Sequence, residues 1–178
     1  MAEQTLSSQL IYQGRLIRVR VDRVRLPNGR ESSREIVEHN GAVAIVALDG
    51  EGNVLLVRQY RKAVERTLLE IPAGTLEAGE EPLKCAHREL QEETGYMAGK
   101  MEHLGGFYSA PGFCTEYLTL YLATDLTPGP SNAEADEDIE LVRLPLAQTR
   151  DLIASGAICD AKSIIGLLSV LSRQKAAI

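Results

Sequence analysis

The feature that most limits the fold is a pair of uninterrupted apolar segments. Residues 42–48 read AVAIVAL, and residues 54–57 read VLLV. A continuous apolar run is typical of a strand that is buried on both faces. The link between them, DGEGN, has the composition of a tight turn, so the segments are predicted to form a hairpin. A sheet that is covered on both faces needs a layer of helices on each side.

One helix is clearly marked between Pro82 and Gly95. Proline is tolerated in the first turn of a helix, and glycine is favoured just after its end. At about 100° per residue, Leu83, Ala86 and Leu90 share one face. The predicted fold class is α+β, an α/β/α sandwich around a mixed central sheet. Its other elements are strands near residues 68–71, 104–108, 117–123 and 139–144 and helices near 146–154 and 161–172.

The first forty residues follow a different pattern. Ile17, Val19 and Val21 alternate with charged residues, as in a strand with one polar face, and Asn28-Gly29 is a hairpin signal. Such strands need a cover for their other face. We therefore predict two domains, an N-terminal antiparallel β unit of residues 1–40 and a main domain of residues 41–178.

Composition narrows the class of protein. The chain of 178 residues has a net charge of -6, which argues against nucleic acid as a partner. The start, MAEQTLSSQL, does not look like a signal peptide, and no apolar run is long enough to cross a membrane. Three scattered cysteines favour neither disulfides nor zinc, so we expect a cytoplasmic location.

Three glutamates on the predicted helix carry the chemistry. Glu89, Glu92 and Glu93 are three and four residues apart, so they lie on one stripe opposite the apolar face. Their mutual repulsion would be relieved by a hard cation such as Mg²⁺, which prefers carboxylate oxygens. A solvated charged face is the plain alternative, since charge runs usually mark exposed surfaces.

The surrounding spacing decides between these alternatives. Residues 74–96 read GTLEAGEEPLKCAHRELQEETGY. This resembles the Nudix box: Gly, five of any residue, Glu, seven of any, Arg-Glu, an aliphatic, any, Glu-Glu, any, Gly and an aliphatic. The one departure is Tyr96, which stands at the last aliphatic position. So many fixed positions at fixed spacing make the pattern specific.

The resemblance implies a Nudix fold and hydrolysis of a diphosphate joined to a nucleoside. It also implies two or three divalent ions, Mg²⁺ with Mn²⁺ as a possible substitute. The expected metal ligands are Glu89, Glu93, Glu92 and the backbone carbonyl of Ala73. Arg88 would hold the glutamates by ion pairing.

Features outside the box are similar to the ADP-ribose pyrophosphatase branch of this family. EIPAG at residues 70–74 leads into the box, Pro111 lies 15 residues beyond Tyr96, and residues 109–116 read SAPGFCTE. The resemblance implies hydrolysis of ADP-ribose, or a related ADP-sugar, to AMP and ribose 5-phosphate. It also implies a homodimer that exchanges its N-terminal strands. The expected substrate-binding residues are Arg61, Glu35, Glu77, Gly112 and Glu116, with Glu35 acting across the dimer interface.

The general base is left open. Glu92 belongs to the box, whereas Glu137 lies in an acidic loop that matches the loop supplying a catalytic glutamate in this branch, with Glu134 as the fallback. The alternatives to ADP-ribose are another nucleotide sugar, such as GDP-mannose, and a sensor of the same fold that binds without cleaving. The side chain that stacks on the base is also open, because the chain has no tryptophan.

Overall fold

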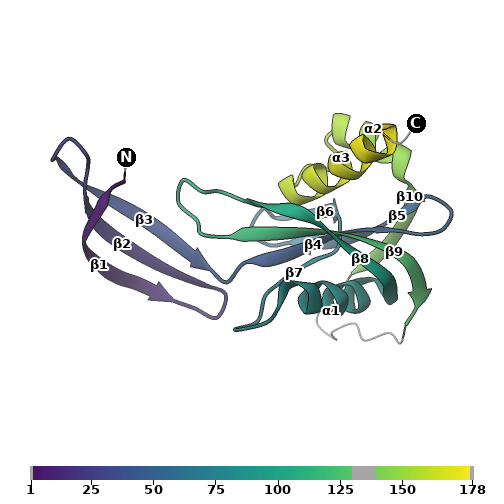
Figure 1. Cartoon of the computed structure of the whole chain (residues 1–178), viewed down its shortest axis with the longest axis horizontal. Helices are drawn as coiled ribbons and strands as arrows, with labels where there is room; N and C mark the ends of the chain where they lie inside the picture. Colours follow the sequence, from purple (N-terminus) through teal and green to yellow (C-terminus); the bar gives the residue numbers. More distant parts are fainter. Residues whose placement is uncertain (1, 130–138, 177–178) are drawn as a thin grey trace. The chain divides into compact units, whose positions relative to one another are not determined.

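A computed structural model covers the chain and describes residues 2–129 and 139–176. The described chain divides into two compact units (Figure 1). The first comprises residues 1–41 together with 108–117, and the second comprises residues 42–107 and 118–178. Each unit is described by itself below.

The first unit is a three-stranded antiparallel sheet in the order β1-β2-β3. Its strands are β1 (Gln4–Gln13), β2 (Ile17–Arg25) and β3 (Glu31–His39). The predicted hairpin joins β2 to β3, with Gly29 at a φ of 84° where a side chain would be strained. The segment 108–117 joins this unit because Val37 pairs with Cys114.

The second unit contains a seven-stranded sheet with the main order β10-β5-β4-β9-β8, to which β6 and β7 add by pairing with β5 and β4. Its central strand, β4, is parallel to β9 and antiparallel to β5 and β7, which confirms the predicted mixed sheet. The strands are β4 (Ala42–Leu48), β5 (Asn53–Arg61), β6 (Arg66–Glu70), β7 (Ala73–Thr75), β8 (Tyr96–Tyr108), β9 (Tyr117–Pro128) and β10 (Glu140–Pro145).

Helices cover both faces of this sheet, so the predicted α/β/α sandwich is confirmed (Figure 1). The side chains of β4 show the two layers. Val43, Ile45 and Ala47 pack in one cluster with α1, while Ala44 and Val46 pack in the other with α3. The helical elements are α1 (Pro82–Thr94), η1 (Leu146–Gln148), α2 (Thr149–Ala154) and α3 (Ala161–Ala176).

The ends of α1 follow the sequence signals. Pro82 occupies the first turn, and Gly95 ends the helix with a left-handed φ of 73° while its N–H donates to the carbonyl of Gln91 at 2.9 Å. The buried face of the helix carries Cys85, Ala86 and Leu90. The burial of this face determines which way the opposite, acidic face of α1 points.

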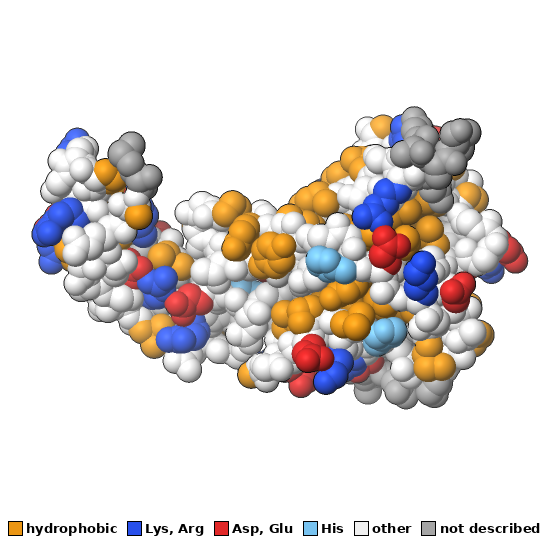
Figure 2. Space-filling model, viewed as in Figure 1, with side chains coloured by type: hydrophobic (Ala, Val, Ile, Leu, Met, Phe, Trp, Pro, Cys, Tyr) orange, Lys and Arg blue, Asp and Glu red, His pale blue; other side chains and the backbone are white. Residues whose placement is uncertain are grey.

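The surface is mixed in character. Figure 2 shows acidic and basic side chains interspersed with exposed hydrophobic ones on the visible face. Among the described residues, no helix is long and apolar enough to span a membrane.

Candidate active site

The acidic face of α1 is organised around one arginine. Arg88 Nη1 donates to Glu89 at 2.8 Å and to Glu92 at 2.9 Å, while Nε and Nη2 bind the two oxygens of Glu80 at 3.0 Å each. The predicted pairing of Arg88 with the glutamates is therefore seen in the structure. One guanidinium faces three carboxylates, so this cluster keeps an excess of negative charge.

Two contacts join α1 to the loop before it. Glu93 Oε2 accepts a hydrogen bond from the Ala73 N–H at 2.9 Å. The carboxylate of Glu89 lies directly on Gly74, where an added Cβ would stand 1.8 Å from its Cδ atom. Glycine is thus required at position 74 so that the carboxylate can approach the backbone. The two contacts bring the backbone of residues 73 and 74 against Glu89 and Glu93.

The pKa values of the cluster follow from these contacts. The hydrogen bonds from Arg88 are the main reason that the pKa of Glu80 falls to about 2, and the carboxylate in turn raises the pKa of Arg88. Burial, followed by the charges of Glu89 and Glu80, raises the pKa of Cys85 to about 12. The Cys85 thiol is therefore protonated at neutral pH and is not a nucleophile.

Acid should weaken this cluster in a defined window. Because the folded-state pKa of Glu80 is about 2 and its ordinary value is 4.5, its pairing with Arg88 stabilises the fold fully above pH 4.5. That contribution is lost as the pH falls from 4.5 towards 2. We expect Glu80→Gln to lose less of its free energy of unfolding than the wild type between pH 5 and pH 3. Urea titrations at several pH values would measure this, and parallel losses in the two proteins would contradict it.

The donor set around residues 73–93 suits a hard divalent cation. It consists of carboxylate oxygens and one backbone carbonyl, which are the ligands that Mg²⁺ prefers. Among residues 2–129 and 139–176, no three His, Cys, Asp or Glu side chains are already arranged as a metal cage, because Glu89 and Glu92 are turned towards Arg88 and Glu93 binds the Ala73 N–H. The residues fit the ion chemically, and their closure around it stays a prediction.

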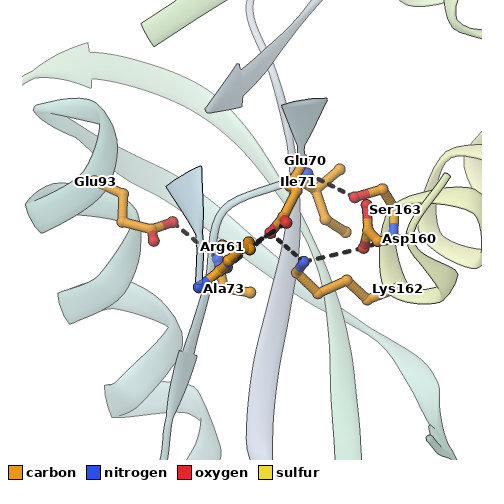
Figure 3. Close-up of polar contacts among 8 residues, drawn as sticks. All are labelled: Arg61, Glu70, Ile71, Ala73, Glu93, Asp160, Lys162 and Ser163. Atoms are coloured by element: carbon orange, nitrogen blue, oxygen red, sulfur yellow. Dashed lines mark hydrogen bonds and ion pairs between the residues drawn. The ribbon is translucent and has the colours of Figure 1, made fainter. Parts of the chain in front are cut away.

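Arg61, the predicted phosphate ligand, lies at the end of β5 and is held by a buried carboxylate (Figure 3). Its Nε donates to Glu70 Oε1 at 3.1 Å, and its Nη2 donates to Oε2 at 2.7 Å. Lys162 Nζ binds the same Oε2 atom at 2.5 Å. Burial alone would raise the pKa of Glu70, but the hydrogen bonds from Arg61 and Lys162 outweigh it and the pKa is lowered.

Three other predicted substrate residues belong to the first unit. Glu35 on β3 and Gly112 line one pocket of about 330 Å³, together with Arg20 and Arg34. Glu116 lies beside His39, with 3.7 Å between its Oε1 atom and the imidazole Nδ1. The structure thus brings Glu35 and Gly112 together, while Arg61 and the box glutamates belong to the second unit.

The remaining predicted residues are placed as follows. Glu77 is exposed in the loop between β7 and α1, where its N–H donates to Glu80 Oε2 at 3.0 Å. Glu137 and its fallback Glu134 lie outside the described residues.

Sequence reasoning missed the network that holds Arg61. It gave no role to Glu70, which binds Arg61. It also gave no role to the residues of the start of α3 that surround Glu70, namely Lys162, Asp160 and Ser163. A buried glutamate next to a strand end could have suggested a cationic partner, since a buried charge is normally paired. Nothing in the sequence indicates that the partner lies 92 residues away.

Comparison with known proteins agrees with this geometry. The model of the NUDIX domain matches residues 38–164, and the model of the nucleoside diphosphate sugar hydrolase N-terminal domain matches residues 3–37. The chain is 44% identical to an ADP-ribose pyrophosphatase of Bacillus subtilis (strain 168), over 92% of this chain and 89% of that protein. It is also 44% identical to a methanol dehydrogenase activator of Bacillus methanolicus, over 93% and 90% of the two chains. A solved structure described as an ADP compounds hydrolase superposes with a TM-score of 0.88 at 26% identity, covering 99% of this chain and 96% of that one.

Proposed function

We propose that this chain, which belongs to the Nudix family, hydrolyses the diphosphate of ADP-ribose or a related ADP-sugar to give AMP and ribose 5-phosphate. The observation that carries the proposal is the joining of Glu89 and Glu93 to the backbone of residues 73 and 74. The similarity to an ADP-ribose pyrophosphatase supports the choice of substrate. The similarity at equal identity to a protein with a different name is the reason for a broad test of substrates.

Divalent metal is general to this family. We propose that Glu89, Glu92, Glu93 and the Ala73 carbonyl hold two or three Mg²⁺ ions, which Mn²⁺ can replace. When bound, such ions neutralise diphosphate charge and acidify water. The protein itself would supply orientation: Arg88 sets the direction of Glu89 and Glu92, and Gly74 admits Glu89 to the backbone.

We propose that five residues contact or approach the substrate. Arg61 would bind the diphosphate, because a guanidinium fork matches phosphate oxygens. Gly112 and Glu116 would contact the diphosphate and terminal ribose, and Glu77 would lie near the substrate. Glu35 would contact the adenosine part.

A base must take the proton of the attacking water, and we propose Glu137, with Glu92 as the alternative. Glu137→Gln is expected to lower kcat by about 10²-fold while leaving KM within about threefold, since general-base catalysis contributes about 10²–10⁴. Steady-state kinetics would measure this, with Glu134→Gln measured in parallel because Glu134 is the fallback base. Full turnover by Glu137→Gln would remove this residue from the mechanism and leave Glu134 and Glu92.

Substrate and metal can be tested together. Purified protein would be incubated with nucleotide sugars, dinucleotides and nucleoside triphosphates, with Mg²⁺ and with excess chelator. We expect ADP-ribose to be the best substrate, AMP to be released, and the chelator to abolish turnover. If no compound is hydrolysed, the proposed enzymatic activity is contradicted and a ligand-binding sensor is favoured. A preference for GDP-mannose or for triphosphates would contradict the proposed substrate.

We also propose that residues 1–40 form a dimerisation and substrate unit, and that residues 41–178 form the hydrolase domain. Support comes from β1, an edge strand of ten residues that carries exposed Leu10, Ile11 and Tyr12. A long exposed strand edge is a ready template for pairing with another chain. Light scattering should give the mass of a dimer, and Leu10→Glu with Tyr12→Glu should shift it towards a monomer. A monomeric wild type would contradict the proposed dimer and, with it, the proposal that Glu35 acts across the dimer interface.

A further inference from the structure

We propose that Glu70 and Lys162 are positioning residues that fix the Arg61 guanidinium in the orientation needed to bind the diphosphate. This inference rests on the proposed function. It assigns a role to the C-terminal helix α3, which carries Lys162 and none of the substrate or metal ligands proposed above.

The first step concerns Glu70, the buried acceptor of the network. Its side chain is only 2% exposed. A carboxylate in such a place needs close cationic partners, because it has lost its water. Arg61 meets it as a fork that uses Nε and Nη2, and such a bidentate pair fixes the plane of the guanidinium as well as its distance.

The second step concerns what holds Glu70 itself. Lys162 Nζ contacts Glu70 Oε2 at 2.5 Å and Asp160 Oδ1 at 3.0 Å. Asp160 also accepts from the Ser163 N–H at 3.1 Å, as a helix cap does. Ser163 Oγ accepts the Ile71 N–H at 2.9 Å, next to Glu70 in the chain. The start of α3 therefore binds both the Glu70 carboxylate, through Lys162, and the neighbouring Ile71 N–H, through Ser163 (Figure 3).

The third step concerns the side of Arg61 away from Glu70. The Arg61 side chain is 40% exposed, in contrast to its partner, so part of it reaches solvent. The fork to Glu70 does not use the two N–H donors on Nη1. The charge of Glu93 contributes to the raised pKa of Arg61, which places the arginine within electrostatic reach of the box. A guanidinium held in this way binds phosphate without first losing side-chain entropy.

The alternative is a buried ion cluster that only stabilises the fold. The two accounts make different predictions for the KM of the substrate. If Glu70 and Lys162 act through Arg61, substitutions of these two residues raise KM only while Arg61 is present. If their role is purely structural, the substitutions raise KM equally with and without Arg61.

The test is a set of double-mutant cycles with ADP-ribose. Glu70→Gln and Lys162→Met are made alone and in an Arg61→Ala background, and Arg173→Met serves as the control, because Arg173 is a cation on the same helix that pairs with Glu102 at the surface. Methionine keeps the apolar length of the lysine stem, so Lys162→Met is the milder of the two. We expect each single variant to raise KM about tenfold and to change kcat less than about threefold.

In the Arg61→Ala background neither variant should raise KM further, although both should still lower the melting temperature. Lys162→Arg, which keeps the charge, should restore most of the KM. Equal increases in KM with and without Arg61, or an unchanged KM with a lower melting temperature, would overturn the inference.

The outcome can be separated from that of the proposed function. If the wild type does not hydrolyse ADP-ribose, the proposed function fails, and equilibrium binding of ADP-ribose to the same variants decides the inference. The inference is supported if the Glu70 and Lys162 substitutions weaken ADP-ribose binding only while Arg61 is present. It is overturned if they weaken binding equally without Arg61, or if the wild type does not bind ADP-ribose.

Discussion

Glu93→Gln is expected to lower kcat by about 10²–10³-fold, the size of effect seen when one preorganised electrostatic group is removed from an active site. The substitution removes a charge but hardly changes the shape. The glutamine carbonyl oxygen can still accept the hydrogen bond from the Ala73 N–H that Glu93 Oε2 receives at 2.9 Å. The loop and helix should therefore stay joined while the affinity for divalent metal falls.

The measurements are kcat at saturating Mg²⁺, the Mg²⁺ dependence of turnover, and the melting temperature. Glu81→Gln is the matched control, since Glu81 precedes the same helix, is 71% exposed and pairs only loosely with Lys84 at 3.4 Å. This control should leave all three quantities unchanged. A Glu93→Gln protein with kcat within twofold of the wild type would remove Glu93 from the proposed metal ligands.

Gly74→Ala is expected to have the second largest effect, a fall of about 10²-fold in kcat with little loss of stability. The added Cβ would stand 1.8 Å from Glu89 Cδ, so the carboxylate must leave the backbone. Glu89 is a flexible side chain and can move, and alanine can adopt the φ of Gly74, which is not among the positive-φ glycines. The damage should therefore fall on the position of one ligand rather than on folding.

Gly50→Ala provides the control for a glycine substitution. Gly50 lies in the turn between β4 and β5, has nothing within 4 Å of an added Cβ and also lacks a positive φ. It should be neutral or slightly stabilising, because alanine reduces the freedom of the unfolded chain. If Gly74→Ala keeps full activity, the close approach of Glu89 has no catalytic purpose. If it unfolds the protein, the expectation of little loss of stability is wrong.

Much of the fold could be predicted because local patterns and burial agree. The apolar run of β4 predicted burial on both faces, and Pro82 and Gly95 predicted the limits of α1. Strand length was harder to predict. β8 runs from Tyr96 to Tyr108, although only residues 104–108 were expected, because its first half carries glycine and charged residues that lower the strand signal.

The site could be predicted only where its residues are close in sequence. Arg88 and the three glutamates lie within one helix, where spacing fixes direction. The link from Arg61 through Glu70 to Lys162 joins β5, β6 and α3, and no periodicity in the sequence encodes such a tertiary contact. The close approach of Glu89 to Gly74 could not be predicted either. The motif shows that glycine is present at this position but not which side chain packs against it.

The alternation along β4 also has a consequence for how the sequence can change. Residues 42–47 are all buried, so no position of this segment can take a polar substitution cheaply. Yet neighbours such as Val43 and Ala44 pack in different clusters. A library that randomises this strand should therefore yield two independent sets of compensating changes, one shared with α1 and one with α3. Side chains that are in contact are coupled, whereas those on opposite faces of the sheet share no packing partners. Adjacent residues such as Val43 and Ala44 would then change together with different partners. Repacking between β4 and α3 would leave the position of α1, which carries the glutamates, unchanged.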